Sequence, residues 1–499
     1  MVNVPTGRRS QGGALGGGPK TDAIYLGREF VQMQHGNSWI TVGGEKVTYG
    51  GPLHHVLIGP NGVGKGMRVL APNLLTIEGK SIVVLDPKGQ LATMTAAFRQ
   101  HVSEVKIIDP FGVIAGLVRE HPREFAPLIE AGLVESVGFN PLASLDPRPD
   151  SPLFYDDAAV ISDALIKIQG NDPHWTESAQ GLVTGLVMWE RLKYGNQANL
   201  EHVRYLLTEA DRYEPIPGRP GKMEQVAGLA VTAEEMVREG GFEIASLAAR
   251  FSAEHTTDEI ESVRSTADTQ TRWMLSRPMR ADLKKDGVDF KKLKSGDWPM
   301  TVYIVLPSER LEDHSIWLRL VVSDALRACM TAGGMRTLFM LDEFAALGHL
   351  SIIQKLFSVT RDYRVQLMPI MQSLEQIQKI YPDRWGTMLG SAGVVQSFRA
   401  TDMITADWFS KRSPPTTVTA LSYNQGSGQS QGGGSSNSGL SYNQIAKQMI
   451  EPHKMFGLTD EQSIAYFMGY ENPSAFAMPH LKQMKLQWSR ALKNPYYYG

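Results

Sequence analysis

Cysteine is almost absent from this sequence. The chain has one cysteine among its 499 residues, Cys329, so it can form neither an internal disulfide nor a thiolate metal site. This usage is typical of a reducing compartment. The sequence also lacks an apolar run near the roughly 18 residues that a membrane helix requires. Its longest candidates, such as GLVTGLVMW, reach about half that length.

An excess of charge is missing as well. The net charge is −2, which excludes a generally basic nucleic-acid protein, so that any DNA would have to meet a local patch or a pore lining. The first residues, MVNVPTGRRSQGGALGGGPK, have no apolar segment of the kind found in signal peptides. We predict a flexible leader at residues 1–20. Hydrophobic and charged fractions of 42% and 20% are ordinary for a folded chain, and the length predicts two or three units.

A glycine-rich segment follows an apolar strand pattern in HVLIGPNGVGKG, residues 55–66. It fits G-x-x-x-x-G-K, in which backbone N–H groups surround nucleotide phosphates and the lysine, here Lys65, reaches the outer two. We expect Gly59, Gly62 and Gly64 to adopt positive φ and leave room for the anion. The position that usually carries a Mg²⁺-binding Ser or Thr is Gly66, and we expect water to replace that oxygen. A glycine-rich surface turn is the alternative interpretation.

Apolar strand patterns alternate with helical patterns on both sides of a long helical stretch. SIVVLD and VKIID precede that stretch, and TVYIV, TLFMLDE, VQLMPIMQ and GVVQSF follow it. This alternation predicts an α/β fold with a mostly parallel sheet covered on both faces. We expect residues 21–150 and 291–499 to form one nucleotide-binding domain, interrupted by an all-α domain at residues 151–290 in which no strand pattern is evident.

A repeated pentapeptide marks a second feature near the C-terminus. LSYNQ occurs at residues 421 and 440, on either side of a segment rich in glycine, serine and glutamine. We predict two arms of a hairpin joined by a flexible tip at residues 425–439.

Acidic and amide side chains stand at three strand ends. Asp342 and Glu343 follow an apolar run, an arrangement in which the first acid holds Mg²⁺ and the second aligns the attacking water. Gln372 ends the next strand pattern, at the edge where parallel sheets bind ligands. Asp86 and Lys88 either line the same site or only close a turn. Acids at an exposed strand end are common, but the upstream phosphate loop favours the functional interpretation.

Six motifs in order resemble one family. GPNGVGKG, LDPKGQL, IIDPFG, GFNPL, LDEFAALG and QSLEQI are similar to motifs of the coupling proteins of conjugation and type IV secretion, the TraG and VirD type, over roughly residues 45–475. The resemblance implies a RecA-like P-loop NTPase domain with an inserted all-α domain that faces the cytoplasm and helps receive DNA or protein. Glycine often follows the phosphate-loop lysine in this family, so Gly66 agrees with the resemblance.

The resemblance also implies roles for individual residues. Lys65 matches the phosphate-loop lysine, Asp342 and Glu343 match the acid pair with Asp342 at Mg²⁺, and Gln372 matches a glutamine that senses the γ-phosphate. Arg361 falls where some members have an arginine that completes the site of a neighbouring subunit. The residues expected to contact ATP are Gly59, Pro60, Asn61, Gly62, Val63, Gly64, Lys65, Gly66 and Asp86.

Arg361 has two competing interpretations. It could be an ordinary surface arginine at a helix end, and nearby Arg364 could take the trans role instead.

The sequence therefore predicts a Mg²⁺- and ATP-dependent P-loop ATPase that pumps DNA, nucleoprotein or effector protein into a type IV secretion channel. The expected partners are DNA, a relaxase or effector protein, channel components and further copies in a hexamer. Family members usually begin with transmembrane helices, so we expect a soluble member or a chain without its anchor, at the cytoplasmic face of the bacterial inner membrane. The alternatives are a housekeeping DNA translocase or helicase and a non-motor adaptor that recruits cargo.

Overall fold

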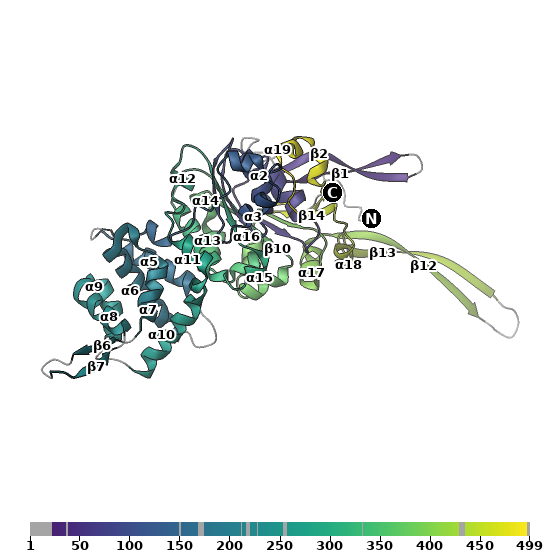
Figure 1. Ribbon diagram of the computed structural model, residues 1–499. Helices are drawn as coiled ribbons and strands as arrows, with labels where there is room; N and C mark the ends of the chain where they lie inside the picture. Colours follow the sequence, from purple (N-terminus) through teal and green to yellow (C-terminus); the bar gives the residue numbers. More distant parts are fainter. Residues whose placement is uncertain are drawn as a thin grey trace.

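An eleven-stranded sheet runs through the centre of the protein in the computed structural model (Figure 1). The structure describes residues 22–35, 38–148, 151–167, 174–210, 212–215, 220–226, 228–252, 257–331, 333–428 and 435–496. The predicted leader at residues 1–20 lies outside these ranges.

The strands that follow the glycine-rich loop and the acids lie in the middle of the sheet. The spatial order is β2 (Ser38–Tyr49), β1 (Ile24–His35), β15 (Ser474–Ala477), β14 (Gln462–Phe467), β11 (Val394–Ser397), β3 (His55–Ile58), β10 (Val365–Met371), β9 (Thr337–Leu341), β4 (Ser81–Asp86), β8 (Met300–Val305) and β5 (Glu104–Ile108). From β11 to β5 all neighbours are parallel. The pairs from β11 to β2 are antiparallel, so the predicted mostly parallel α/β sheet is confirmed.

Both faces of the parallel strands are covered, as their continuous apolar runs require. In β4, Ile82 and Val84 pack into one core and Val83 and Leu85 into another. The first core contains the helical turn η1 (Gly66–Leu70), α1 (Ala71–Leu74), α2 (Gln90–Arg99), α3 (Val113–Glu120), α4 (Ala126–Glu130) and, at its margin, α19 (Lys485–Arg490). The second contains α12 (Lys292–Ser295), α13 (Ser315–Cys329), α14 (Ser351–Tyr363), α15 (Leu374–Ile380), α16 (Trp385–Ser391), α17 (Met403–Arg412) and α18 (Pro452–Phe456).

Seven described helices from the segment between β5 and β8 form a bundle at one end of the molecule (Figure 1). Its helices are α5 (Phe154–Leu165), α6 (His174–Tyr194), α7 (Leu200–Thr208), α8 (Gly228–Glu239), α9 (Gly241–Ala248), α10 (Asp258–Thr271) and α11 (Arg277–Leu283). The long helix α6 packs against α5, α7, α9 and α10. The expectation of no strand here is wrong, because β6 (Arg212–Pro215) and β7 (Met223–Val226) pair as an antiparallel hairpin. RYEP and MEQV lack the apolar alternation that would reveal strands.

Two hairpins extend from the opposite end of the sheet (Figure 1). One is formed by β1 and β2, and the other by β12 (Pro415–Gly428) and β13 (Ser435–Gln448). The two LSYNQ copies face each other in the second hairpin, with Leu421 opposite Tyr442. Pairing continues from Asn424 opposite Gly439 to Gly428 opposite Ser435, so the strands reach into the predicted tip, of which residues 429–434 lie outside the described ranges. Among the described residues, no helix has the length and apolar character to cross a bilayer.

Candidate nucleotide-binding site

The glycine-rich loop connects the buried strand β3 to the helical turn η1. Gly62 and Gly64 have φ of 86° and 82°, a region in which side chains are strained. Around Gly62 an added Cβ would meet no atom within 4 Å, so backbone conformation alone requires glycine there. The expectation of positive φ is wrong for Gly59, where a Cβ would instead lie 3.1 Å from Phe398. A side chain at residue 59 would thus be crowded by Phe398 of a distant segment and by Val63 of the loop itself.

The other loop residues differ in exposure, and the tip of the loop, Asn61 and Gly62, is its exposed part. Pro60 is half-buried, and Val63 is 1% exposed within the sheet core. The loop therefore has an anchored apolar side chain beneath a backbone that is open to a ligand. Helix η1 begins at Gly66, directly after Lys65, which directs the free N–H groups of a helix start toward the loop.

Lys65 bends back over the loop from the helix start. Its Nζ donates hydrogen bonds to the carbonyl oxygens of Gly59 at 2.6 Å and Pro60 at 3.3 Å. Burial lowers the pKa of Lys65, while the nearby charges of Asp342 and Glu343 act in the opposite direction. The predicted phosphate-binding lysine and acid pair therefore face one site.

Two carboxylates stand side by side where β4 and β9 end. Leu85 pairs with Leu341, so the next residues, Asp86 and Asp342, occupy neighbouring strand ends. Burial raises the pKa of Asp86 to about 7, and the charge of Asp342 adds to this shift. Burial likewise raises the pKa of Asp342 to about 6, against the opposing effect of Lys65. Asp86 Oδ2 also accepts a hydrogen bond of 2.8 Å from the Ala92 N–H, so it both caps α2 and borders the site.

Glu343 and Gln372 follow neighbouring strands and their side chains are in contact. Strand β10 lies between β3 and β9, which places Gln372 between the glycine-rich loop and the acids. Gln372 Nε2 donates to Glu343 Oε2 at 3.3 Å. Glu343 has φ of 52°, a conformation rare for non-glycine residues and often found at functional sites. The structure thus brings these two predicted residues into contact.

The two candidate arginines lie away from this edge of the sheet. Arg361 is in the last turn of α14, and its side chain lies outside what the structure describes. Arg364 precedes β10, has φ of 50°, and donates from Nη1 to the Gly334 carbonyl at 3.2 Å. Gln372 follows the same strand at its other end. Both arginines therefore lie at the edge of the sheet opposite the glycine-rich loop. From these backbone positions, neither is placed in the chain's own site.

The C-terminal segment was not predicted to border the site. Tyr496 Oη donates to the carbonyl oxygen of Lys88 at 2.5 Å, and Asn494 Nδ2 lies 3.7 Å from Met67 Sδ, just beyond the glycine-rich loop. Lys88 itself acts electrostatically on Lys65 and Asp342. No sequence signal could have placed Tyr496 here, because the contact joins segments about 400 residues apart.

The residues suit a nucleotide with Mg²⁺. The described residues contain no cluster of three or more His, Cys, Asp or Glu able to hold a metal by themselves. Mg²⁺ is usually held by one or two carboxylates together with waters and substrate phosphates. Asp86 and Asp342 lie beside a glycine-rich loop whose tip is exposed, and they match that requirement.

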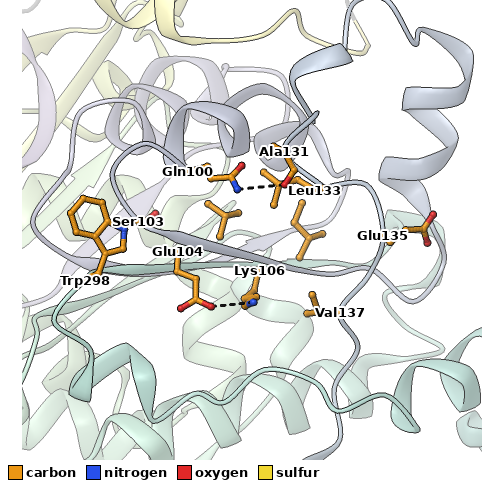
Figure 2. A pocket seen from close by; sticks show the side chains of 12 residues that line it. Gln100, Ser103, Glu104, Lys106, Ala131, Leu133, Glu135, Val137 and Trp298 are labelled. Carbon is orange, nitrogen blue, oxygen red and sulfur yellow. Dashed lines mark hydrogen bonds and ion pairs between the residues drawn. The ribbon is translucent and has the colours of Figure 1, made fainter. Parts of the chain in front are cut away.

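Other cavities lie away from this edge of the sheet. Figure 2 shows a hollow of about 390 Å³ along β5, lined by Gln100, Glu104, Lys106 and Trp298 among others. Some of its polar groups are paired: Lys106 forms a 3.1 Å ion pair with Glu104, and Gln100 Nε2 donates to the Ala131 carbonyl at 3.4 Å. Strand β5 is at the sheet edge, five strand positions from β3, or about 24 Å. This hollow is separate from the nucleotide-binding site.

Comparison with known proteins agrees with this geometry. A family model described as type IV secretory system conjugative DNA transfer matches residues 19–116 and 132–475. Conjugal transfer protein TraG of Agrobacterium fabrum (strain C58) is 26% identical over 429 residues, which cover 84% of this chain and 59% of the relative. The type IV secretion system-coupling protein VirD4 of Bartonella quintana is also 26% identical, over 81% of this chain and 59% of that protein.

Solved structures show the same fold. The bacterial conjugative coupling protein TrwB superposes with a TM-score of 0.61 at 14% identity, over 95% of this chain and 96% of that chain. A TrwB structure in complex with ADP and Mg²⁺ has a TM-score of 0.58 at 13% identity, covering 94% and 96%. This chain spans about three fifths of the length of the curated relatives. Since the family model covers most of the sequence, the chain belongs to the family of type IV secretory system conjugative DNA transfer proteins.

Proposed function

We propose that this chain is an ATP-hydrolysing coupling protein that recruits DNA, nucleoprotein or effector protein and drives it into a type IV secretion channel. One observation carries the proposal: Gln372 is hydrogen-bonded to Glu343 beside the phosphate-loop lysine. A nucleotide hydrolase needs a group that positions water and a group that responds to the γ-phosphate within one site. A structural nucleotide site would need neither.

Each side chain has a distinct task in this proposal. Lys65 exchanges its bonds to the Gly59 and Pro60 carbonyls for the outer phosphates. Asp342, with a pKa near 6, is mostly ionised at neutral pH and holds Mg²⁺, which neutralises phosphate charge. Glu343 orients the attacking water and accepts its proton. Gln372 reports the presence of the γ-phosphate to Glu343 through the hydrogen bond between them.

The partners follow from the family. TraG and VirD4 relatives are named for conjugal transfer and type IV secretion coupling, so we place this chain with a secretion channel at the cytoplasmic face of the inner membrane. The helical unit at residues 151–290 receives the cargo. The active form is a hexamer in which Arg361 of one copy completes the site of the next. This accounts for an arginine that lies at the edge of the sheet opposite its own loop.

Two substitutions test the proposal. Lys65→Ala and Glu343→Gln should each lower DNA-stimulated ATP hydrolysis by about 100-fold or more. Lys106→Ala and Glu104→Gln, in the half-exposed ion pair on β5, are matched controls and should retain the wild-type rate. Normal turnover in either site variant contradicts the proposed mechanism. Absence of hydrolysis by the unmodified chain at every protein concentration, with and without DNA, favours a cargo-recruiting adaptor.

A further inference from the structure

The position after the phosphate-loop lysine lacks a hydroxyl although the structure has space for one. Gly66 does not have positive φ. A Cβ added there would meet only one atom within 4 Å, Gln90 Oε1 at 3.9 Å. Neither backbone conformation nor crowding therefore requires glycine at this position. The group nearest to the missing side chain is itself a neutral oxygen.

The turn before α2 holds Gln90 in this place. Gly89 has φ of 64° and ends the turn, and Asp86 Oδ2 accepts the Ala92 N–H in the first turn of the helix. The start of α2 is thereby fixed against the strand that also carries Asp86 into the site. Gln90 is half-buried, and within the described part of the chain its side chain makes no hydrogen bond. Its amide is free to bind something else.

We propose that the amide oxygen of Gln90 replaces the missing Ser or Thr hydroxyl and contacts the Mg²⁺ that accompanies bound nucleotide, directly or through one of its waters. The inference rests on the proposed function of the site. Mg²⁺ prefers oxygen ligands, and an amide oxygen has no net charge, like the hydroxyl it replaces. The amide therefore adds no charge to the site. Gln90, instead of water alone, compensates for Gly66.

The test compares nucleotide affinity with and without Mg²⁺ in the full chain. Dissociation constants of a fluorescent ADP are measured in excess Mg²⁺ and in EDTA, and Mn²⁺ binding to the ADP complex is followed by electron paramagnetic resonance. Gln90→Ala should weaken binding about 10-fold in Mg²⁺, by analogy with the loss of an outer-shell metal partner. The affinity in EDTA should remain unchanged, and the Mn²⁺ affinity should fall in parallel.

The double variant Gly66→Ser/Gln90→Ala tests whether a hydroxyl at residue 66 can replace the Gln90 amide. A Cβ is accommodated at residue 66, and the serine hydroxyl should restore the Mg²⁺-dependent affinity. Gln100→Ala, just after α2 at its far end, is the control and should behave as wild type. An unchanged Mg²⁺ dependence in Gln90→Ala overturns the inference. So does an equal loss in Mg²⁺ and EDTA, or a loss that Gly66→Ser does not reverse.

Failure of the proposed function has a different signature. In that case the unmodified chain hydrolyses no ATP at any protein concentration, with or without DNA, while its ADP binding and the Mg²⁺ dependence of that binding are still measured. The inference about Gln90 fails instead when Gln90→Ala binds ADP like the unmodified chain in both Mg²⁺ and EDTA.

Discussion

At the residue scale, the burial of Asp86 lowers the stability of the protein without nucleotide at neutral pH. Its side chain is 2% exposed, and burial raises its pKa from 3.8 to about 7. Between these values the folded state holds a proton that the unfolded chain has released. The free energy of unfolding contributed by this group therefore falls as pH rises from about 4 to about 7, and stays low above that range.

Asp86→Asn should remove this decline. The amide keeps an oxygen to accept the Ala92 N–H but has no charge to bury. Relative to wild type, the variant should gain about 1–4 kcal/mol in free energy of unfolding between pH 5 and pH 8, measured by denaturant unfolding without nucleotide. Asp146→Asn is the control, since the hydrogen bond from Arg148 holds the pKa of Asp146 at about 2, below the window. A difference between Asp86→Asn and wild type that is constant with pH contradicts the assignment.

At the element scale, one buried arginine joins the site to the helical bundle. Arg319 is in α13, 5% exposed, and donates from Nη1 to the carbonyls of Leu347 at 3.1 Å and His349 at 2.5 Å. These carbonyls belong to the segment that follows Asp342 and Glu343 after β9. From Nε it donates to the Ala164 carbonyl in α5 at 3.2 Å. The loop after Glu343 and the bundle are therefore held by the same side chain.

Arg319→Met should unpair these buried carbonyls while nearly preserving volume. We expect a loss of about 2–5 kcal/mol in free energy of unfolding, because several buried acceptors lose their donor, measured by denaturant unfolding. Arg310→Met, whose ion pair with Asp313 spans 3.8 Å at the surface, should change stability by less than about 1 kcal/mol. Equal effects of the two substitutions contradict a structural role for Arg319.

Sequence patterns predicted the elements whose burial is local. The apolar runs of β4 and β9 identify strands covered on both faces, and positive φ at Gly62 and Gly64 follows from the phosphate-loop pattern. Contacts set by tertiary structure could not be read in this way. Gly59 is constrained by Phe398, and the Glu343 contact of Gln372 depends on β10 lying between β3 and β9. No local periodicity specifies that order.

At the scale of the whole molecule, strand β10 separates Gln372 from Arg361. Gln372 follows the strand at the nucleotide edge, whereas Arg361 lies just before its start. Seven residues of strand place these ends about 23 Å apart. An arginine at that distance does not reach the chain's own site, which agrees with the proposed role of Arg361 as an arginine finger supplied in trans.

Mixing two inactive variants tests this arrangement. Lys65→Ala and Arg361→Ala should each abolish hydrolysis alone. In a mixture of equal parts, a copy with intact Lys65 can neighbour a copy with intact Arg361, and about a quarter of the sites should recover. Arg364→Ala is the control for Arg361→Ala. Assayed alone, it should hydrolyse ATP. A mixture as inactive as its two components contradicts the trans role.

The central claim is that this chain is a DNA-stimulated ATPase that assembles to function, and one measurement tests it most directly. ATP hydrolysis per subunit is recorded over increasing protein concentration, with and without DNA, alongside the mass of the native assembly. We predict a rate that rises steeply as the mass shifts from one copy toward a ring, and that DNA increases further. A rate that stays at background while rings form in the presence of DNA would contradict the account.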